Sequence, residues 1–122
     1  MPSASALEKM IPLLSHDTFE QLFTPEKKLE KPVIISFSAS WCGPCSKLDW
    51  DFVLEEFPTI PIYYCDIDKN KYTPGFCNIK SIPSILMLTP GENRSSIVGP
   101  LQTSDTAKLC SWILMNIKSF SK

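Results

Sequence analysis

Runs of apolar residues with two different periods alternate along this chain. Residues 33–37 are an almost unbroken run of β-branched and aromatic side chains, which is typical of a central strand covered on both faces. Residues 60–67 form a second run of strand-forming residues. Between these runs, from Cys42 onward, apolar residues recur at helical spacing until Pro58 ends the pattern. The first half of the chain therefore predicts a strand, a long helix and a second strand.

The residues before the first strand predict weaker elements. Residues 1–6 are mostly small, and we expect a frayed terminus there. Residues 11–14 predict a short strand, which must lie at a sheet edge because Pro12 has no N–H to donate. Asp17 is expected to cap a short helix over residues 19–23. An edge strand and a helix are thereby added to the predicted sheet.

The second half of the chain predicts a hairpin and a closing helix. Residues 68–78 indicate a loop with one weak helical turn. Residues 84–88 are a third apolar strand, and residues 90–93 form a turn into a short strand at residues 95–98. A last helix opens at Ser104 and carries an apolar stripe. Because helices between strands imply crossovers, we predict an α/β fold in which one mixed sheet has helices on both faces.

Size, charge and cysteine content narrow the function classes. The 122 residues suit one compact domain, so we treat residues 1–122 as a single domain. Twelve basic and thirteen acidic residues leave a net charge of −1, which argues against nucleic acid or an anionic membrane as partner. No apolar run reaches the roughly 18 residues that span a bilayer, and we expect no secretory signal. The five cysteines include only one close pair, which favours a reducing compartment and a cytoplasmic location.

Cys42 and Cys45 lie where the predicted central strand becomes a helix. Cysteines at i and i+3 share one helical face, and a disulfide between them needs Cα atoms roughly 4.4–6.8 Å apart. Free N–H groups and the helix dipole at a helix start lower a thiol pKa from about 8.5 to roughly 3.5–7.5. Pro44 is tolerated in the first turn because its missing N–H would be unpaired there. We therefore predict that Cys42 attacks a partner disulfide and that the more buried Cys45 resolves the mixed disulfide.

Two other interpretations of this pair stay open from the residues alone. A C-x-x-C pair can be half of a zinc site. The remaining cysteines (65, 77 and 110) contain no second close pair and His16 is the only histidine, so we expect no metal. The pair can also be a structural or inert disulfide, although the junction of a strand with a helix favours a reactive thiolate.

Several segments carry a resemblance to a known family. They are FSASWCGPC at residues 37–45, CDID at 65–68, SIPS at 81–84, and PGE at 90–92 followed by VG at 98–99. In order and spacing they resemble the thioredoxin family over roughly residues 11–117. The resemblance implies a thioredoxin fold and a thiol–disulfide oxidoreductase that reduces protein disulfides by dithiol–disulfide exchange through Cys42 and Cys45. It also implies electrons from a thioredoxin reductase, ordinarily a flavoenzyme that uses a nicotinamide cofactor, and no bound cofactor beyond the redox-active disulfide. We expect a monomer.

The resemblance also implies a docking surface around the cysteine pair. It implies a cis peptide bond before Pro83, whose cost of about 0.5–1 kcal/mol can be offset by packing. The backbone of Ile82 is then expected to pair with an extended substrate segment, as in β-augmentation. The resemblance places six residues on a flat apolar surface, which are Trp41, Gly43, Pro44, Ile82, Pro83 and Gly99.

Two central positions depart together from the family pattern. Thioredoxins usually carry a buried aspartate where this chain has Ser36, and the lysine that commonly partners it corresponds to Tyr64. A serine cannot replace a carboxylate as acceptor of the Cys45 proton at neutral pH. We therefore expect slow resolution of the mixed disulfide, with water as the proton relay, unless Ser36 merely fills volume in the strand.

Other departures concern packing. Ser38 stands where the family usually has a tryptophan, and Trp50 replaces the proline that usually kinks the long helix. Without that proline we expect a straighter helix over residues 42–57. These changes bear on the identity of the partner rather than on the type of reaction.

The three remaining cysteines divide into two groups. Cys65 in a predicted strand and Cys110 on the last helix are interpreted as apolar core residues. Cys77 follows a loop-like segment and resembles in position an extra cysteine of animal thioredoxins. An exposed thiol at Cys77 would be a candidate regulatory site, through an intramolecular or intermolecular disulfide.

Two functions other than a protein-disulfide reductase stay open. The chain can be a dedicated oxidase or isomerase of the same superfamily, although the pair Gly43 and Pro44 favours a reductant. It can also be a binding module whose docking surface matters more than turnover.

Overall fold

The central sheet is mixed, as predicted. The structure is a computed structural model that describes residues 2–23, 31–90 and 96–118. Within these residues the sheet has five strands, in the spatial order β1-β3-β2-β4-β5. The strands are β1 (Ile11–Pro12), β2 (Val33–Ser38), β3 (Ile62–Asp66), β4 (Ser84–Thr89) and β5 (Ser96–Gln102). β3 runs parallel to β1 and β2, whereas β4 runs antiparallel to β2 and β5.

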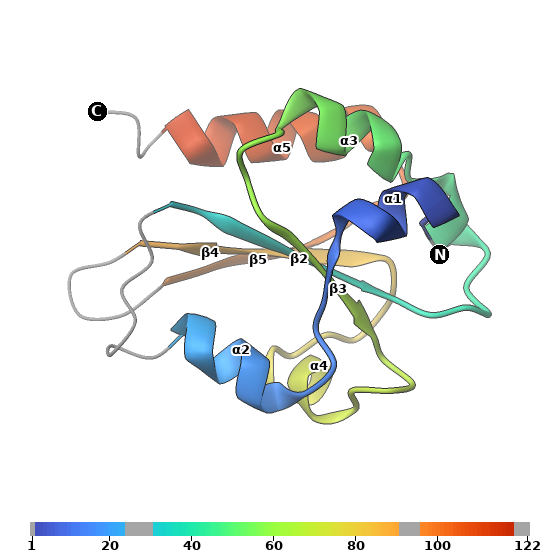
Figure 1. The fold of residues 1–122 in the computed structure, drawn as a ribbon, viewed down its shortest axis with the longest axis vertical. Helices are drawn as coiled ribbons and strands as arrows, with labels where there is room; N and C mark the ends of the chain where they lie inside the picture. Colours follow the sequence, from blue (N-terminus) through green and yellow to red (C-terminus); the bar gives the residue numbers. More distant parts are fainter. Residues whose placement is uncertain (1, 24–30, 91–95, 119–122) are drawn as a thin grey trace.

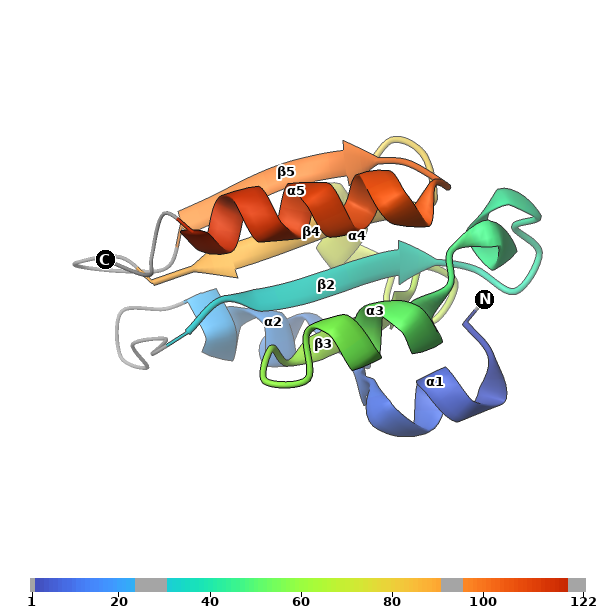
Figure 2. The same cartoon turned by 90° about the horizontal axis from the view of Figure 1, so that it is seen from above.

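Helices cover both faces of this sheet (Figure 1). They are α1 (Ala4–Lys9), α2 (His16–Phe23), the 3-10 helix η1 (Pro44–Lys47), α3 (Trp50–Glu56), α4 (Tyr72–Phe76) and α5 (Thr106–Lys118). Figures 1 and 2 show α1, α3 and α5 over one face and α2 and α4 over the other. The predicted α/β architecture is therefore confirmed.

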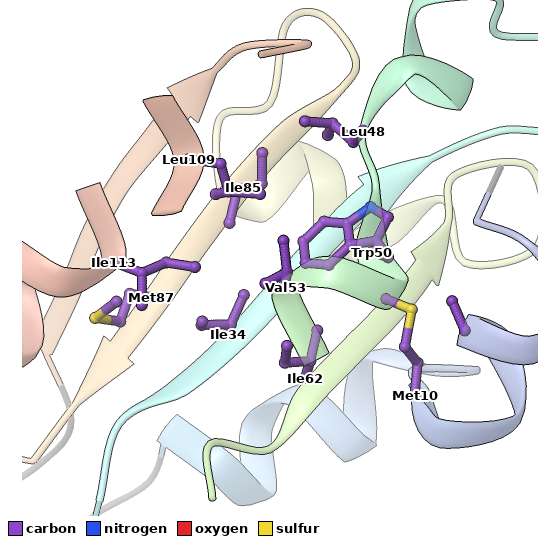
Figure 3. Close-up of a cluster of buried hydrophobic side chains, with 11 residues drawn as sticks. Met10, Ile34, Leu48, Trp50, Val53, Ile62, Ile85, Met87, Leu109 and Ile113 are labelled. Carbon is purple, nitrogen blue, oxygen red and sulfur yellow. The ribbon is translucent and has the colours of Figure 1, made fainter. Parts of the chain in front are cut away.

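β2 lies at the centre of the sheet and packs against both helical layers. All six of its residues are buried. On the side of α3 and α5, Ile34 belongs to a cluster that includes Val53 and Ile113 (Figure 3). On the other side, Phe37 packs in a cluster with Phe19 of α2. Burial on both faces explains why the β2 sequence is almost continuously apolar instead of alternating.

The N-terminal segment is ordered into a helix, so the predicted fraying of residues 1–6 is wrong for its described part. Ser3 caps α1, because its side chain accepts a hydrogen bond from the N–H of Ala6. The hydroxyls of Ser3 and Ser5 both donate to the carboxylate of Asp51 on α3, and these bonds lower the pKa of Asp51. Ala6 is fully buried in the α3–α5 cluster. Capping and burial together hold α1 on the domain.

The predicted straight helix over residues 42–57 is also wrong. η1 ends at Lys47, Leu48 is extended, and Asp49 starts the separate helix α3. The side chain of Asp49 accepts a hydrogen bond from the N–H of Phe52 at 3.1 Å, which is an N-cap. Trp50, at the first position of α3, is buried in the core shown in Figure 3. An N-cap and a buried indole thus break the helix without a proline.

The remaining predicted elements are present, with some differences in their bounds. α2 begins at His16, so Asp17 lies in its first turn and is not its cap. α5 begins at Thr106 and not at Ser104. Cys110 is half-buried and not a fully buried core residue.

β1 lies at a sheet edge and the segment after β3 contains one short helix, α4. β4 and β5 pair antiparallel as a hairpin. The predicted turn at residues 90–93 lies outside the described residues except for Pro90.

Candidate active site

Cys42 and Cys45 lie between the end of β2 and the first turn of η1. The structure holds them as a disulfide with a Cα–Cα distance of 5.4 Å, inside the range that a disulfide requires. The N–H of Cys42 donates to the carbonyl of Ala39 at 3.2 Å, so the chain turns sharply after β2. Cys42 is 6% exposed and Cys45 is 2% exposed. Cys42 is therefore the more accessible of the two sulfur-bearing residues.

The electrostatic support for a Cys42 thiolate is local. The expected long helix is absent, and η1 has only four residues, so its macrodipole is small. The N–H of Cys45, however, lies 3.2 Å from the Sγ of Cys42. A hydrogen bond that a thiolate accepts from a backbone N–H stabilises the charged form. This N–H takes over the role that the sequence assigned to a long helix.

The loop before β4 faces the cysteine pair. The peptide bond between Ile82 and Pro83 is cis, which confirms the expectation for Pro83. The Sγ of Cys42 lies 3.9 Å from the carbonyl oxygen of Ile82. Ile82 also packs against the small cluster formed by Ala39 and the two cysteines. The structure thus brings Ile82 and the redox pair together.

An open groove of about 300 Å³ lies next to the pair. We call it the Trp41 groove, and it is lined by Trp41, Ile67, Pro74, Ile79, Lys80, Ser81 and Ile82. Trp41 is 66% exposed, and its Nε1–H donates to Oδ2 of Asp68 at 2.8 Å. This bond holds the exposed indole in one orientation. Asp68 has a positioning role that the sequence analysis missed, although CDID at residues 65–68 contains it.

The other predicted docking residues lie in different surroundings. Gly43 and Pro44 are exposed at the start of η1, whereas Pro83 is buried. Gly99 does not line the Trp41 groove and lies on β5 with φ +104°. A Cβ at Gly99 would lie 2.9 Å from the carbonyl oxygen of Ile85, so glycine is required by backbone packing there. The peptide bond between Gly99 and Pro100 is also cis, which no sequence signal predicted.

Ser36 is buried on β2, the strand that leads to the cysteine pair. It is 1% exposed and lies between Tyr64 of β3 and Ile85 of β4. Burial, with smaller contributions from Asp66 and other neighbours, raises the pKa of Tyr64 to about 12. Ser38 is also buried, and its Oγ has no hydrogen-bond partner among the described residues. Neither Ser36 nor Tyr64 therefore supplies a charged group at neutral pH.

The regulatory role considered for Cys77 required an exposed thiol, and the structure buries this residue. Its N–H donates to the carbonyl of Thr73 at 2.9 Å, which closes α4 and turns Cys77 inward. Cys77 is 7% exposed, and burial raises its pKa to about 12. Cys65 is fully buried and also has a pKa of about 12, raised mainly by burial. Cys110 is half-buried on α5, where burial and nearby Glu56 raise its pKa.

The difference in thiol pKa predicts a strong contrast in reactivity. We expect iodoacetamide at pH 7.5 to alkylate Cys42 of the reduced protein rapidly, because the nearby Cys45 N–H favours its thiolate. Cys65 and Cys77, whose pKa values are raised to about 12, stay protonated. Cys65 and Cys77 should be alkylated only after unfolding in guanidinium. Peptide mass spectrometry measures both, and mild peroxide should produce only the Cys42–Cys45 bridge. Rapid labelling of Cys77 in the native protein would contradict the buried position.

The side chain of His16 contacts residues of both α2 and α4. Its Nδ1 lies 2.9 Å from Oγ1 of Thr73 and its Nε2 lies 3.4 Å from the Glu20 carboxylate. Its ring also packs against Tyr72 and Phe76 of α4. His16 therefore ties α2 to α4. Among the described residues, no group of three His, Cys, Asp or Glu side chains is placed to hold a metal ion.

The comparisons with known proteins agree with this geometry. The family described as Thioredoxin matches residues 11–113. A chloroplastic M-type thioredoxin of Brassica napus is 30% identical over 100 residues, which are 80% of this chain and 55% of that protein. A thioredoxin of Rickettsia conorii is 34% identical over 89 residues, covering 70% of this chain and 82% of that protein. The chain spans about half the length of the chloroplast relatives that it matches.

Solved structures share the same architecture. The crystal structure of Schistosoma mansoni thioredoxin is 29% identical, with a TM-score of 0.68 over 93% of this chain and 97% of that chain. A cysteine pair between a central strand and a short helix, opposite a cis-proline loop, defines a domain of the thioredoxin fold. With the match over residues 11–113, the chain belongs to the thioredoxin family. None of its described helices is long and apolar enough to cross a membrane.

Proposed function

We propose that this chain, as a single domain, is a thiol–disulfide oxidoreductase that reduces protein disulfides through Cys42 and Cys45. The observation that carries the proposal is the position of the Cys42 Sγ. It accepts the Cys45 N–H at 3.2 Å and lies 3.9 Å from the Ile82 carbonyl oxygen. In the reduced protein this N–H would favour the Cys42 thiolate, and the sulfur lies beside a backbone edge that can hold an extended peptide.

The reaction consists of two exchanges. The Cys42 thiolate attacks one sulfur of the substrate disulfide, forms a mixed disulfide, and releases the other substrate sulfur as a thiolate. Cys45 then loses its proton and attacks the Cys42 Sγ, which releases the second substrate thiol. Two electrons pass to the substrate, and the Cys42–Cys45 disulfide remains. A reductase must return two electrons to complete the cycle.

The burial of the two cysteines separates their roles. Cys42 follows Trp41, whose exposed side chain lines the groove. Cys45 is 2% exposed, so it cannot compete for the external disulfide. Their Cα–Cα distance of 5.4 Å allows ring closure without moving the backbone far. This arrangement supports Cys42 as nucleophile and Cys45 as the resolving thiol.

We also propose the partners and the setting of the reaction. The electron donor is a thioredoxin reductase or its equivalent, and the acceptors are proteins with disulfides. The chain works as a monomer in the cytoplasm, with no cofactor of its own. The free thiols of Cys65, Cys77 and Cys110 suit a reducing compartment. The relatives named thioredoxins support the same pair of partners.

Two measurements on the intact chain test the activity. With dithiothreitol as electron source, the protein should accelerate the reduction of insulin. The Cys42/Cys45 couple should have a midpoint potential of about −270 mV. A potential near about −120 mV would instead indicate an oxidase. No catalysis, combined with retained binding of a protein partner, would indicate a binding module. Either of these results would overturn the proposed reductase.

A further inference from the structure

The Trp41 groove has an uneven distribution of charge. Lys80 is the one lining residue with a full charge, and its side chain is exposed. All other lining residues are apolar except Ser81. The groove therefore joins an apolar channel to a single ammonium group. Ile82 lines the groove, and its carbonyl oxygen lies 3.9 Å from the Cys42 Sγ, so the groove lies close to the reacting sulfur.

Lys80 has no carboxylate partner within the described ranges, where the one ion pair joins His16 to Glu20. Asp68 lies beside the groove and keeps its negative charge, because the Trp41 Nε1–H that its Oδ2 accepts at 2.8 Å is a neutral donor. Lys80 is nevertheless the charged group of the lining itself, and it is exposed. Its ammonium group is therefore free to pair with a carboxylate of a bound segment.

We propose that the groove selects disulfides held in extended, acidic segments of the substrate protein. Side chains at i and i+2 of an extended segment point to the same side. One apolar side chain then fills the space beside Trp41, and a carboxylate two residues away pairs with Lys80. This inference rests on the proposed function and adds a substrate class to it. Lys80 is thereby a specificity-determining residue.

The expected preference is modest. Ion pairs at exposed positions contribute little and are screened by salt. We expect wild-type protein to reduce an acidic peptide disulfide about three- to fivefold faster, in kcat/KM, than a basic one. Raising the salt from about 20 to 300 mM should remove most of this preference, because the Debye length falls below about 10 Å.

Two peptides and one charge reversal test the proposal. The peptides share one disulfide and one sequence, and differ only in Glu or Lys at the position two residues from an apolar residue that flanks the half-cystine. The readout is the ratio of kcat/KM for the Glu peptide to that for the Lys peptide. Lys80→Glu should invert this ratio. Lys118→Glu is the matched control, because Lys118 is exposed at the end of α5, away from η1 in Figures 1 and 2.

The outcomes separate this inference from the proposed function. A wild-type ratio near one, or a ratio that Lys80→Glu leaves unchanged, overturns the selection of acidic segments. Reduction of neutral hydroxyethyl disulfide by the wild-type protein tests turnover alone. If turnover is absent, the proposed reductase fails. The charge preference is then measured as the ratio of the dissociation constants of the two peptides for the oxidised protein, and equal constants overturn it.

Discussion

A Cys45→Ser variant is expected to accumulate a stable mixed disulfide between Cys42 and its substrate. Cys45 is the internal thiol that attacks the Cys42 sulfur, and its Cα lies 5.4 Å from that of Cys42. A serine hydroxyl has nearly the same size and cannot perform thiol exchange. Because Cys45 is 2% exposed, external thiols approach the mixed disulfide slowly from the side of residue 45. Turnover should fall by about a thousandfold or more, while the first step still proceeds.

The adduct is measured by incubating the reduced variant with insulin and separating the products on a non-reducing gel. Mass spectrometry should locate the bond at Cys42. Cys42→Ser should show neither adduct nor turnover, because the attacking sulfur is gone. Cys110→Ser is the matched control, since Cys110 is a half-buried thiol outside the pair, and its activity should equal that of the wild type. An adduct formed with Cys42→Ser would assign the nucleophile to another cysteine.

Much of the fold could be predicted because its signals are local. β2 is buried on both faces, and a run of apolar residues is the direct result of such burial. Pro12 marks an edge strand because it lacks an N–H, and β1 is indeed at the edge. The string around Cys42 and Cys45 is a sequence motif, and the cis bond at Pro83 followed from its resemblance to the family. These features depend on few distant contacts.

The wrong predictions depend on contacts between segments far apart in the sequence. α1 is held by hydrogen bonds from Ser3 and Ser5 to Asp51, which lies more than 40 residues later. The break before α3 needs the burial of Trp50 in a core assembled from several elements. The burial of Cys77, which the sequence left open, likewise comes from a cluster that includes Phe19 of α2 and Phe37 of β2. Periodicity within a short window carries no information on such partners.

The site shows the same division between local and distant information. Cys42 and Cys45 are three positions apart in the sequence, so their pairing was predictable. The bond from Trp41 to Asp68 and the charge of Lys80 beside the groove arise only when three segments meet. The role assigned to a long helix is instead met by one N–H of Cys45. Short-range geometry, rather than a macrodipole, therefore supports the reactive sulfur.

Ser36→Asp is expected to accelerate the second exchange by about tenfold, because it supplies a buried carboxylate on β2 as an acceptor for the Cys45 proton. The rate is the decay of a preformed mixed disulfide at Cys42, followed by rapid quenching and mass spectrometry. Ser36→Asn is the matched control, since it has the same size and cannot accept a proton at neutral pH. It should resolve no faster than the wild type.

The same variant should lose stability as the pH rises. Ser36 is 1% exposed, so burial should raise the pKa of an aspartate there above its unfolded value of about 3.9. The folded state then retains a proton that the unfolded state has lost. The free energy of unfolding, relative to Ser36→Asn, should fall by about 1.4 kcal/mol per pH unit between about pH 4 and the raised pKa, and stay level above it. Urea unfolding at several pH values measures this loss.

A second substitution, at Tyr64, tests the effect of the new carboxylate on the exchange rate separately from its effect on stability. Tyr64 is the register neighbour of Ser36 on β3, so Ser36→Asp/Tyr64→Lys places a cation beside the new carboxylate and should recover part of the lost stability at neutral pH. If Ser36→Asp loses stability with rising pH and still resolves the mixed disulfide no faster than Ser36→Asn, the carboxylate is buried but does not accept the Cys45 proton. Ser36 then only fills volume, and water alone carries the Cys45 proton in this protein.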